Sequence, residues 1–385
     1  MTALAMAACG PAPDDSTVTV SDSAGVEIVT SSRPAWGEGE GWRLAAAPTV
    51  EIADFLRLVS ATRLSDGRIA AADASSRIRI YGSDGRLLAA WGREGSGPGE
   101  LTGIGSLQRL PDDSLWVYDG QAERVVVLSP TGEVARTLPI RTPGNEPLGP
   151  VARMSDGGMV AGAGWVSSQL PRPVQSGIHR DPASPVWILS PSGDVIDTLG
   201  AFPGLEVGVQ VIEGGGMAVG NPPFGHTLSI LPVGDRILIG TGDNLEVRSF
   251  DRSGRLLRII RGPPLDLVPT AAEVQALRAA LLATLRDPRT RALMERLQRQ
   301  EAVPQRKAAY TRMLADPGGN LWLSPWESVV REGGDWTVFG PEGRLLGTVA
   351  VPMGFYLLEV GDDYLMGRWR NDLRAEVLRV YPLVK

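Results

Sequence analysis

Three arginines recur at one position of a repeated pattern. Arg63, Arg109 and Arg153 each stand directly before an apolar residue near the end of a predicted strand. A guanidinium group binds a carboxylate or a phosphate through two parallel hydrogen bonds. Three of them at one height predict a site for a small anionic ligand. The alternative is structural, with each arginine bridging neighbouring units through backbone carbonyls or an acid.

The strands predicted to carry these arginines contain few acids. Glu359 is the clearest, whereas Asp73 and Asp119 follow the next strand of their units at equivalent positions. Hard cations such as Ca²⁺ need several converging oxygens, and a repeated Asp after a strand more often caps a turn. We therefore place Glu359 with the arginines as a ligand-binding candidate. We predict no metal ligand, no cofactor and no catalytic residue.

Nucleophiles and bases are scarce. The chain has two histidines, His179 and His226, and one cysteine, Cys9. It contains no H-E-x-x-H motif, no Walker loop and no G-x-S-x-G elbow. Each histidine is expected to be an ordinary loop or hydrogen-bonded residue. Trp165 and Trp326, outside the repeated strands, are candidates for contact with a sugar or a peptide.

Composition excludes several classes of protein. The 385 residues include 38 Lys and Arg against 44 Asp and Glu, which gives a net charge of −6. This balance disfavours nucleic-acid binding, which needs clustered positive charge. Hydrophobic residues make up 43% of the chain and charged residues 21%, so a folded core is expected.

A β-unit repeats along the chain. Turn glycines follow short apolar runs, and residues seven and five positions before each glycine are almost all apolar, with the two-residue step of a strand. The glycines are Gly85, Gly132, Gly193, Gly254 and Gly343, and the residues seven positions earlier are Ile78, Val125, Val186, Val247 and Trp336.

A sixth unit begins at Val360 and stops before its fourth strand. An unpaired sheet edge would invite aggregation. The N-terminal region offers two strands that could complete this sheet, at residues 26–30 and 50–52. Six four-stranded units with one donated strand predict an all-β fold, a six-bladed β-propeller closed by an N-terminal strand.

The repeated turn–strand–Asp pattern around Asp73 and Asp119, with the glycine ladder from Gly92 to Gly99, resembles bacterial six-bladed propellers related to the NHL repeat and to the TolB-like superfamily. The resemblance covers residues 22–385. It implies the fold and little about function, because propellers perform many unrelated tasks. Enzymes with this fold, such as lactonases, place carboxylates around a calcium ion in the central channel.

Residues 270–303 differ in composition from the repeat. Thr270 and Glu273 form a capping-box pattern, and Asp287 before Pro288 marks a second helix start. We predict a helical hairpin inserted between the fourth and fifth blades and lying against one face of the disc. It would act as a lid over apolar edges or as an element that gates a ligand or partner.

Residues 1–21 are expected to be a truncated lipoprotein-type signal and a flexible tether. Small residues precede Cys9, as at a bacterial lipidation site, and a polar stretch rich in Pro, Asp, Ser and Thr follows it. The stretch before Cys9 lacks a basic start, so the alternative is an ordinary structural cysteine. The first interpretation predicts an exported protein, either a lipoprotein of the cell envelope or a periplasmic or extracellular one.

These observations favour a monomeric, exported binding module over an enzyme. Its expected partner is a small ligand or an envelope protein, with no nucleic acid, and with a membrane only through a lipid anchor. The rival interpretation is a channel-centred, metal-dependent hydrolase or lyase of the lactonase kind, with Glu359 among the ligands of a Ca²⁺ ion.

Overall fold

The computed structural model describes residues 17–97, 99–164, 170, 172–212, 216–328, 330–370 and 375–385. These residues form many β-strands, one 3₁₀ turn (Pro143–Asn145) and two α-helices, so the all-β prediction is confirmed. No helix in these ranges is long and apolar enough to cross a membrane. Cys9 lies outside the described residues.

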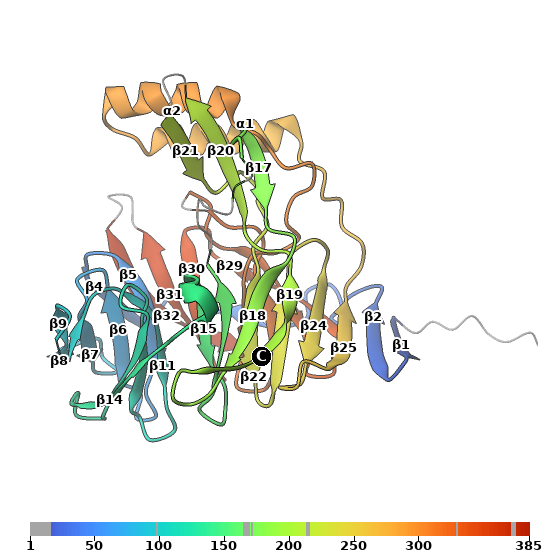
Figure 1. Ribbon diagram of the computed structural model, residues 1–385. Coiled ribbons are helices and arrows are strands. Elements are labelled where there is room, and N and C mark those ends of the chain that lie inside the picture. Colours follow the sequence, from blue (N-terminus) through green and yellow to red (C-terminus); the bar gives the residue numbers. More distant parts are fainter. Residues whose placement is uncertain are drawn as a thin grey trace, which may run out of the picture.

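Six sheets of four or more strands make up the lower body in Figure 1. In the first three, successive strands along the sheet are antiparallel neighbours. Their strands are β5 (Leu58–Arg63), β6 (Ile69–Asp73), β7 (Ile78–Tyr81) and β8 (Leu87–Trp91); β11 (Ile104–Arg109), β12 (Leu115–Asp119), β13 (Arg124–Leu128) and β14 (Val134–Pro139); and β15 (Leu148–Arg153), β16 (Met159–Ala163), β18 (Ser184–Leu189) and β19 (Val195–Phe202). A short parallel pair, β9 (Arg93–Glu94) and β10 (Glu100–Leu101), joins the first sheet to the second.

The other three sheets repeat this order and also take up the N-terminal strands. Their own strands are β22 (Ser229–Val233), β23 (Arg236–Gly240), β24 (Glu246–Phe250) and β25 (Leu256–Arg261); β26 (Met313–Ala315), β27 (Leu321–Leu323), β28 (Gly334–Phe339) and β29 (Leu345–Val351); and β30 (Phe355–Val360), β31 (Tyr364–Arg370) and β32 (Glu376–Val384). The last sheet therefore has three strands of its own.

The predicted register is confirmed by burial and backbone geometry. The five turn glycines have φ between 78° and 92°, a region that a residue with a Cβ rarely adopts. The five residues seven positions earlier lie on the third strands and are at most 1% exposed. Six apolar clusters fill the spaces between successive sheets, and one of them joins the last sheet to the first. The core is thus divided into six layers between sheets.

The N-terminal segment crosses the outer edges of three sheets, and we call residues 26–55 the strap. Strand β2 (Val26–Ser31) pairs in parallel with β25, and β1 (Val18–Ser23) extends this sheet further. The amides of Ala35 and Trp36 then donate to the carbonyls of Leu345 and Leu346, at 3.0 and 2.8 Å. Finally β3 (Arg43–Leu44) and β4 (Val50–Phe55) both pair with β32. Of the two N-terminal segments considered, residues 50–55 thus supply a fourth strand to the last sheet.

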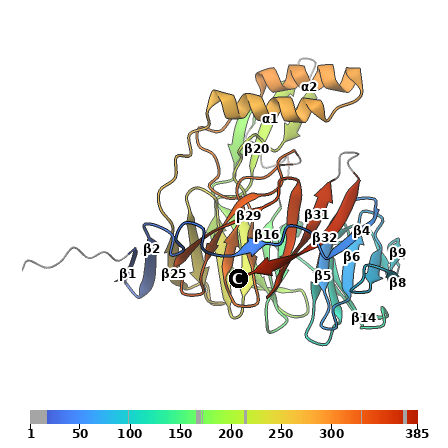
Figure 2. The ribbon, with the colours of Figure 1, turned by 180° about the vertical axis from the view of Figure 1, so that it is seen from behind.

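A separate layer, which we call the cap, stands above one end of the sheets (Figures 1 and 2). It contains a three-stranded sheet of β17 (Gly177–Arg180), β20 (Glu206–Ile212) and β21 (Gly216–Gly220), together with α1 (Ala271–Ala283) and α2 (Pro288–Gln300). The Nε2 atom of Gln210 donates to the carbonyl of Leu297 at 2.6 Å and joins the small sheet to α2.

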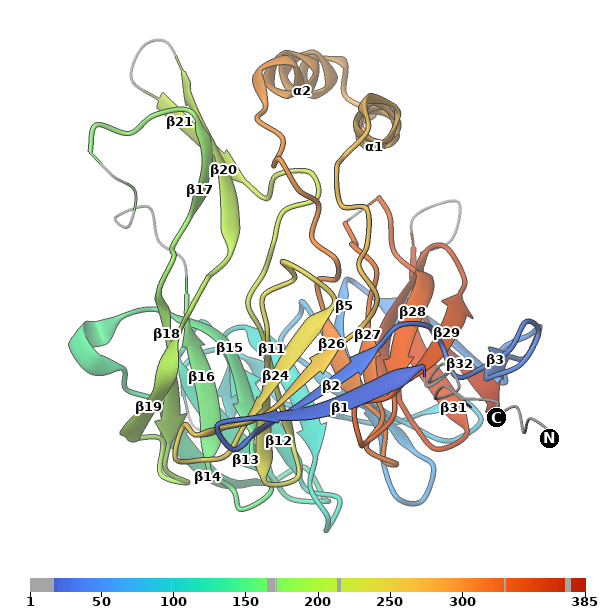
Figure 3. The same cartoon turned by 90° about the vertical axis from the view of Figure 1, so that its right-hand side faces the viewer.

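The cap differs from the expected hairpin lying on the disc. The capping box of Thr270 and Glu273 is formed, and Asp287 caps α2 through the amide of Thr290. The helices nevertheless stand away from the large sheets, beside the small sheet (Figure 3). The sequence pattern did not predict β20 and β21, and these strands supply a partner for the helices at that height.

Candidate functional site

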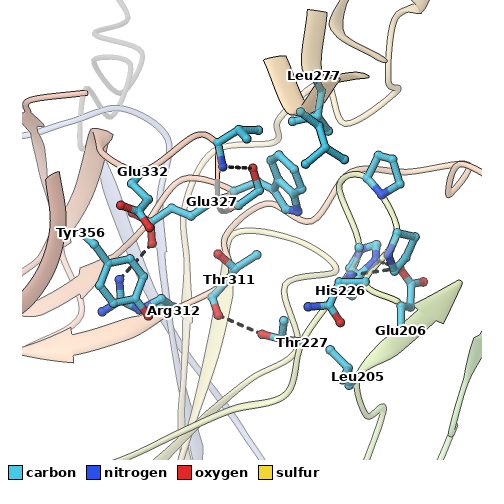
Figure 4. A pocket seen from close by; sticks show the side chains of 18 of the residues that line it. Leu205, Glu206, His226, Thr227, Leu277, Thr311, Arg312, Glu327, Glu332 and Tyr356 are labelled. Atoms are coloured by element: carbon cyan, nitrogen blue, oxygen red, sulfur yellow. Dashed lines mark hydrogen bonds and ion pairs between the residues drawn. The ribbon is translucent and has the colours of Figure 1, made fainter. Parts of the chain in front are cut away.

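A cavity of about 650 Å³ lies between the cap and the near ends of the large sheets, and we call it the cap cavity. Figure 4 shows that its walls come from distant parts of the chain, with Leu277 of α1 above and Arg312, Tyr356 and Thr311 below. Cavities of roughly 300–1,000 Å³ are the usual size of small-molecule sites. The cap therefore covers a cavity that is large enough to hold a small molecule.

Several apolar side chains line this cavity, although Arg278 of α1, Gln298 of α2 and Glu301 directly after α2 line it too. Leu277 and Leu281 project from α1, and Leu205 lines the cavity at the base of the small sheet. Trp326 also lines it, and its ring packs against Phe224 with centroids 4.7 Å apart. Trp326, an aromatic candidate from the sequence, thus lies where it can contact a ligand. Trp165 lies outside the described residues.

The floor contains an arginine held between two aromatic rings. The guanidinium carbon of Arg312 lies 3.8 Å from the ring centre of Tyr356 and 5.5 Å from that of Trp336. Its Nη1 donates to the buried carboxylate of Glu327 at 3.0 Å, and its Nη2 donates to the carbonyl of Leu357 at 2.5 Å. Stacking and hydrogen bonds together fix the plane of this guanidinium.

Two more floor arginines share buried acids. Glu332, whose side chain is 5% exposed, accepts hydrogen bonds from Arg368 at 2.6 Å and Arg370 at 2.8 Å. Arg370 also donates to Glu376 at 3.1 Å, and Glu376 accepts from the amide of Leu58 at 2.6 Å. Burial raises the pKa of Glu332, and the two arginines offset only part of that rise. The charges of Arg368 and Arg370 are therefore balanced by buried acids of the protein itself.

One side wall contains a histidine–carboxylate pair. The Nδ1 atom of His226 lies 2.8 Å from Glu206, and Nε2 lies 3.7 Å from Asp243, which Arg180 also binds at 2.7 Å. Burial alone would raise the pKa of Glu206, but hydrogen bonds from the side chain and amide of His226 outweigh it and lower the pKa. Both residues also line a neighbouring cavity of about 480 Å³. The pair thus forms a polar partition between two cavities.

The sequence predicts that His226 is an ordinary hydrogen-bonded residue, and the contacts that it makes in the structure agree with this interpretation. His226 lies in the loop that precedes β22. Glu206 lies 20 positions earlier in a strand that has no counterpart in the repeat. No local signal joins these two residues, so sequence reasoning missed the partition.

The candidate anion site lies at the opposite end of the same strands. Arg63, Arg109 and Glu359 line a second cavity of about 490 Å³, which we call the far cavity. Strands β5, β26 and β30 begin at the cap cavity and end at the far cavity. The structure therefore brings three of the four predicted ligand-binding residues together.

Arg153 does not join them, and its placement corrects the prediction. It is not among the residues that line the far cavity. Burial and the nearby charge of Arg136, on strand β14, lower its pKa, while Asp156 acts in the opposite direction. Its guanidinium thus lies in the surroundings of the neighbouring strand and the turn after β15. The side chains of Arg63 and Arg153 both lie against the glycine of the following turn, Gly67 and Gly157, yet only Arg63 lines the far cavity.

The repeated aspartates accept hydrogen bonds from backbone amides of nearby loops, which agrees with the turn-capping role that the sequence predicts. Asp73 accepts from the amides of Ser75 and Leu56, and Asp119 accepts from the amides of Thr102 and Gly103. Hydrogen bonds to these carboxylates outweigh burial and lower both pKa values. Within the described ranges, no group of three or more His, Cys, Asp or Glu side chains is placed to hold a metal ion.

No protein-family model and no curated protein matches the chain. Among solved structures, a member of the DUF4221 family from Bacteroides vulgatus is 12% identical, with 89% of this chain and 99% of that chain covered and a TM-score of 0.52. The fold is β-propeller-like.

Two enzymes also resemble the chain at lower scores. A gluconolactonase from Xanthomonas campestris is 13% identical over 85% of this chain and 87% of that one, with a TM-score of 0.45. Virginiamycin B lyase from Staphylococcus aureus is 10% identical over 84% and 94%, with a TM-score of 0.40. At such identities the likeness concerns the fold and not the function.

Proposed function

We propose that this chain is an exported binding module, a six-bladed β-propeller whose capped end holds an organic ligand with a large apolar surface. The six layers of apolar side chains between sheets support the blade number, since each sheet packs on the next and the last packs on the first. Strand β4 would close the last blade, and α1 and α2 would be an insert between the fourth and fifth blades. The residues around Cys9 support export and lipid anchoring.

The observation that carries the ligand proposal is the contrast between the apolar side chains that α1 and Trp326 contribute and the floor arginines Arg312, Arg368 and Arg370, which are paired with buried acids. Leu277, Leu281 and Trp326 offer apolar surface, whereas Glu327 and Glu332 already neutralise the arginines below. A charged ligand would have to compete with these short ion pairs. An apolar ligand only needs to displace water from these apolar side chains, which is favourable in proportion to the area covered.

The proposal can be tested with a neutral apolar dye. Nile red should bind the native chain saturably, with increased emission, and Leu281→Glu should weaken this binding about tenfold, because burying a leucine-sized apolar contact stabilises by roughly 1.5–3 kcal/mol. Ala280→Glu is the matched control, since Ala280 is the exposed neighbour on α1. Equal affinity in both variants would contradict a ligand site under the cap.

The rival proposal, a metal-dependent hydrolase or lyase, has weaker support in the described part of the chain. Glu359, its candidate ligand, accepts hydrogen bonds from the hydroxyl of Tyr364 and from the amide of Arg63. Those contacts already engage the Oε1 atom of its carboxylate, which leaves fewer lone pairs for a cation. The propeller enzymes resemble this chain in fold alone, so they add no support for lactone or lyase chemistry here.

A further inference from the structure

The far cavity contains two arginines that differ from those on the floor of the cap cavity. Four ionisable acids and bases dominate its lining: Arg63, Arg109, Glu359 and Asp316, with the phenol of Tyr364 beside them. Which ligand this cavity can take depends on which of these charges are already paired within the protein, and it does not depend on the site under the cap.

Both acids already have partners. Asp316 accepts from the side-chain amide of Asn320 at 2.8 and 2.9 Å and from the indole of Trp322 at 3.3 Å. Glu359 accepts from Tyr364 and from the amide of Arg63. Burial raises the pKa of Glu359, although hydrogen bonds from Thr62 and Tyr364 and the charge of Arg109 act against the rise. Burial therefore makes the charged form of Glu359 less favourable than that of a glutamate in water.

The guanidinium of Arg63 is held in place without being neutralised. It lies 4.8 Å from the ring centre of Tyr364, whose hydroxyl is tied to Glu359. Its nearest carboxylate is Asp363 at 4.0 Å, and that side chain is 84% exposed. An exposed pair at this distance contributes little. The ring therefore orients Arg63 and leaves its N–H groups available.

Arg109 lies at the end of the neighbouring strand β11, and its guanidinium, like that of Arg63, is not neutralised by a close acid. Its Nη1 lies 3.6 Å from Asp113, beyond hydrogen-bond distance. Asp113 is itself bound by Ser65, through the amide at 3.0 Å and the hydroxyl at 2.5 Å. Within the described residues, neither Arg63 nor Arg109 donates a side-chain hydrogen bond to an acid at 3.5 Å or less.

We propose that the far cavity binds a small organic carboxylate, whose oxygen atoms are shared between the guanidinium groups of Arg63 and Arg109. Two forks on adjacent strands match a carboxylate, which accepts paired N–H donors. A cavity of about 490 Å³ has room for more than a carboxylate group, which is why we propose an organic ligand and not an inorganic ion. The site is distinct from the cap cavity and lies at the opposite end of β5 and β30.

The test uses citrate as the probe and the full chain as the protein. Isothermal titration at low ionic strength should show citrate binding that weakens as NaCl is added, because added salt screens partly exposed charges. Arg63→Gln with Arg109→Gln should reduce the affinity at least tenfold, since each hydrogen bond to a charged group contributes about 1.5–3 kcal/mol. Arg153→Gln is the matched control, because Arg153 ends β15 as Arg63 ends β5 but does not line the cavity.

Each outcome decides the proposal. Loss of binding in the double variant with retention in Arg153→Gln supports it, and equal loss in both overturns it. Inorganic phosphate and sulfate form the second arm, and binding as tight as that of citrate would overturn the organic part of the claim. If the double variant loses its native melting transition, Arg63→Lys with Arg109→Lys keeps the charges and removes the forks. Unchanged citrate affinity in that pair would overturn bidentate recognition. Leu281→Glu should leave citrate binding unchanged, which separates this site from the one under the cap.

Discussion

The two ends of strands β5, β26 and β30 use arginine in opposite ways. At the cap end, Arg312, Arg368 and Arg370 have carboxylate oxygens at 2.6 to 3.1 Å from acids that are almost fully buried. At the far end, Arg63 and Arg109 are 35% and 39% exposed, with acids at 4.0 and 3.6 Å. The difference shows that an arginine's role follows from the distance and burial of its acid. The first group is engaged by buried acids of the protein, whereas the second group is more exposed and lies farther from its acids.

The largest expected effect comes from removing a buried acid at the cap end. Glu332→Gln would leave Arg368 and Arg370 without one of their counter-charges, and breaking a buried pair typically costs about 3–5 kcal/mol. Urea denaturation should show this loss of unfolding free energy. Asp363→Asn is the matched change at the far end and should cost less than about 1 kcal/mol. Similar losses in the two variants would remove the distinction between the ends.

The second effect concerns the pH dependence set by Glu359. Because its pKa is raised in the folded protein, the unfolded chain ionises first as pH increases, and stability is lost from about the ordinary value of 4.5 up through the folded pKa. Glu359→Gln removes this loss while keeping an acceptor oxygen for Tyr364.

Denaturation curves at several pH values should therefore show Glu359→Gln gaining on the wild type above pH 4.5, with no such gain in stronger acid. The comparison of the two proteins cancels the opposite trend of acids whose pKa values are lowered, such as Asp251, where hydrogen bonds from Ser253 and Arg255 lower the pKa to about 2. If the difference in unfolding free energy between Glu359→Gln and the wild type does not vary with pH, Glu359 has an ordinary pKa.

A smaller effect should separate ligand binding at the two ends. Gln210→Leu removes the hydrogen bond between β20 and α2, which contributes about 0.5–1.5 kcal/mol. A looser cap should speed the dissociation of Nile red several-fold in stopped-flow experiments, and citrate binding at the far end should not change. Slower release of citrate in this variant would mean that the two cavities are coupled.

The smallest expected effect is that of Ca²⁺. Since no described cluster of acids converges on a cation site, the melting temperature should be the same with Ca²⁺ and with EDTA. A ligand that binds the folded state raises this temperature by mass action. A rise with Ca²⁺ that EDTA reverses would favour the metal-dependent hydrolase and direct the next assays to lactones and esters.

The positions that sequence reasoning predicted well are those that local periodicity controls. Val125 and Trp336 are buried on third strands because a two-residue period and a turn glycine specify a strand and its inward face. The same periodicity predicted that Arg63 and Arg109 lie close together, and they do so because β5 and β11 are neighbours in the core. It failed for Arg153, which does not line the far cavity although its side chain lies against the turn after β15 as that of Arg63 does after β5.

The cap cavity could not be predicted from the repeat. Its floor depends on Glu332, in the irregular segment before β28, meeting Arg368 and Arg370 from a different sheet. Its roof depends on helices docking on β20, a strand without a counterpart in the other units. Such contacts join residues far apart in sequence, and no spacing rule connects them. Only Trp326 carried a signal, as an aromatic residue outside the repeated strands.

The strap has a consequence for the order of events during synthesis. Strand β4 is synthesised long before its partner β32, and the contact between Thr49 and Val380 spans 331 positions. Contacts of such long range form slowly, because a long loop must close first. The last sheet therefore stays incomplete until β32 has been made, which makes its closure a late step of folding.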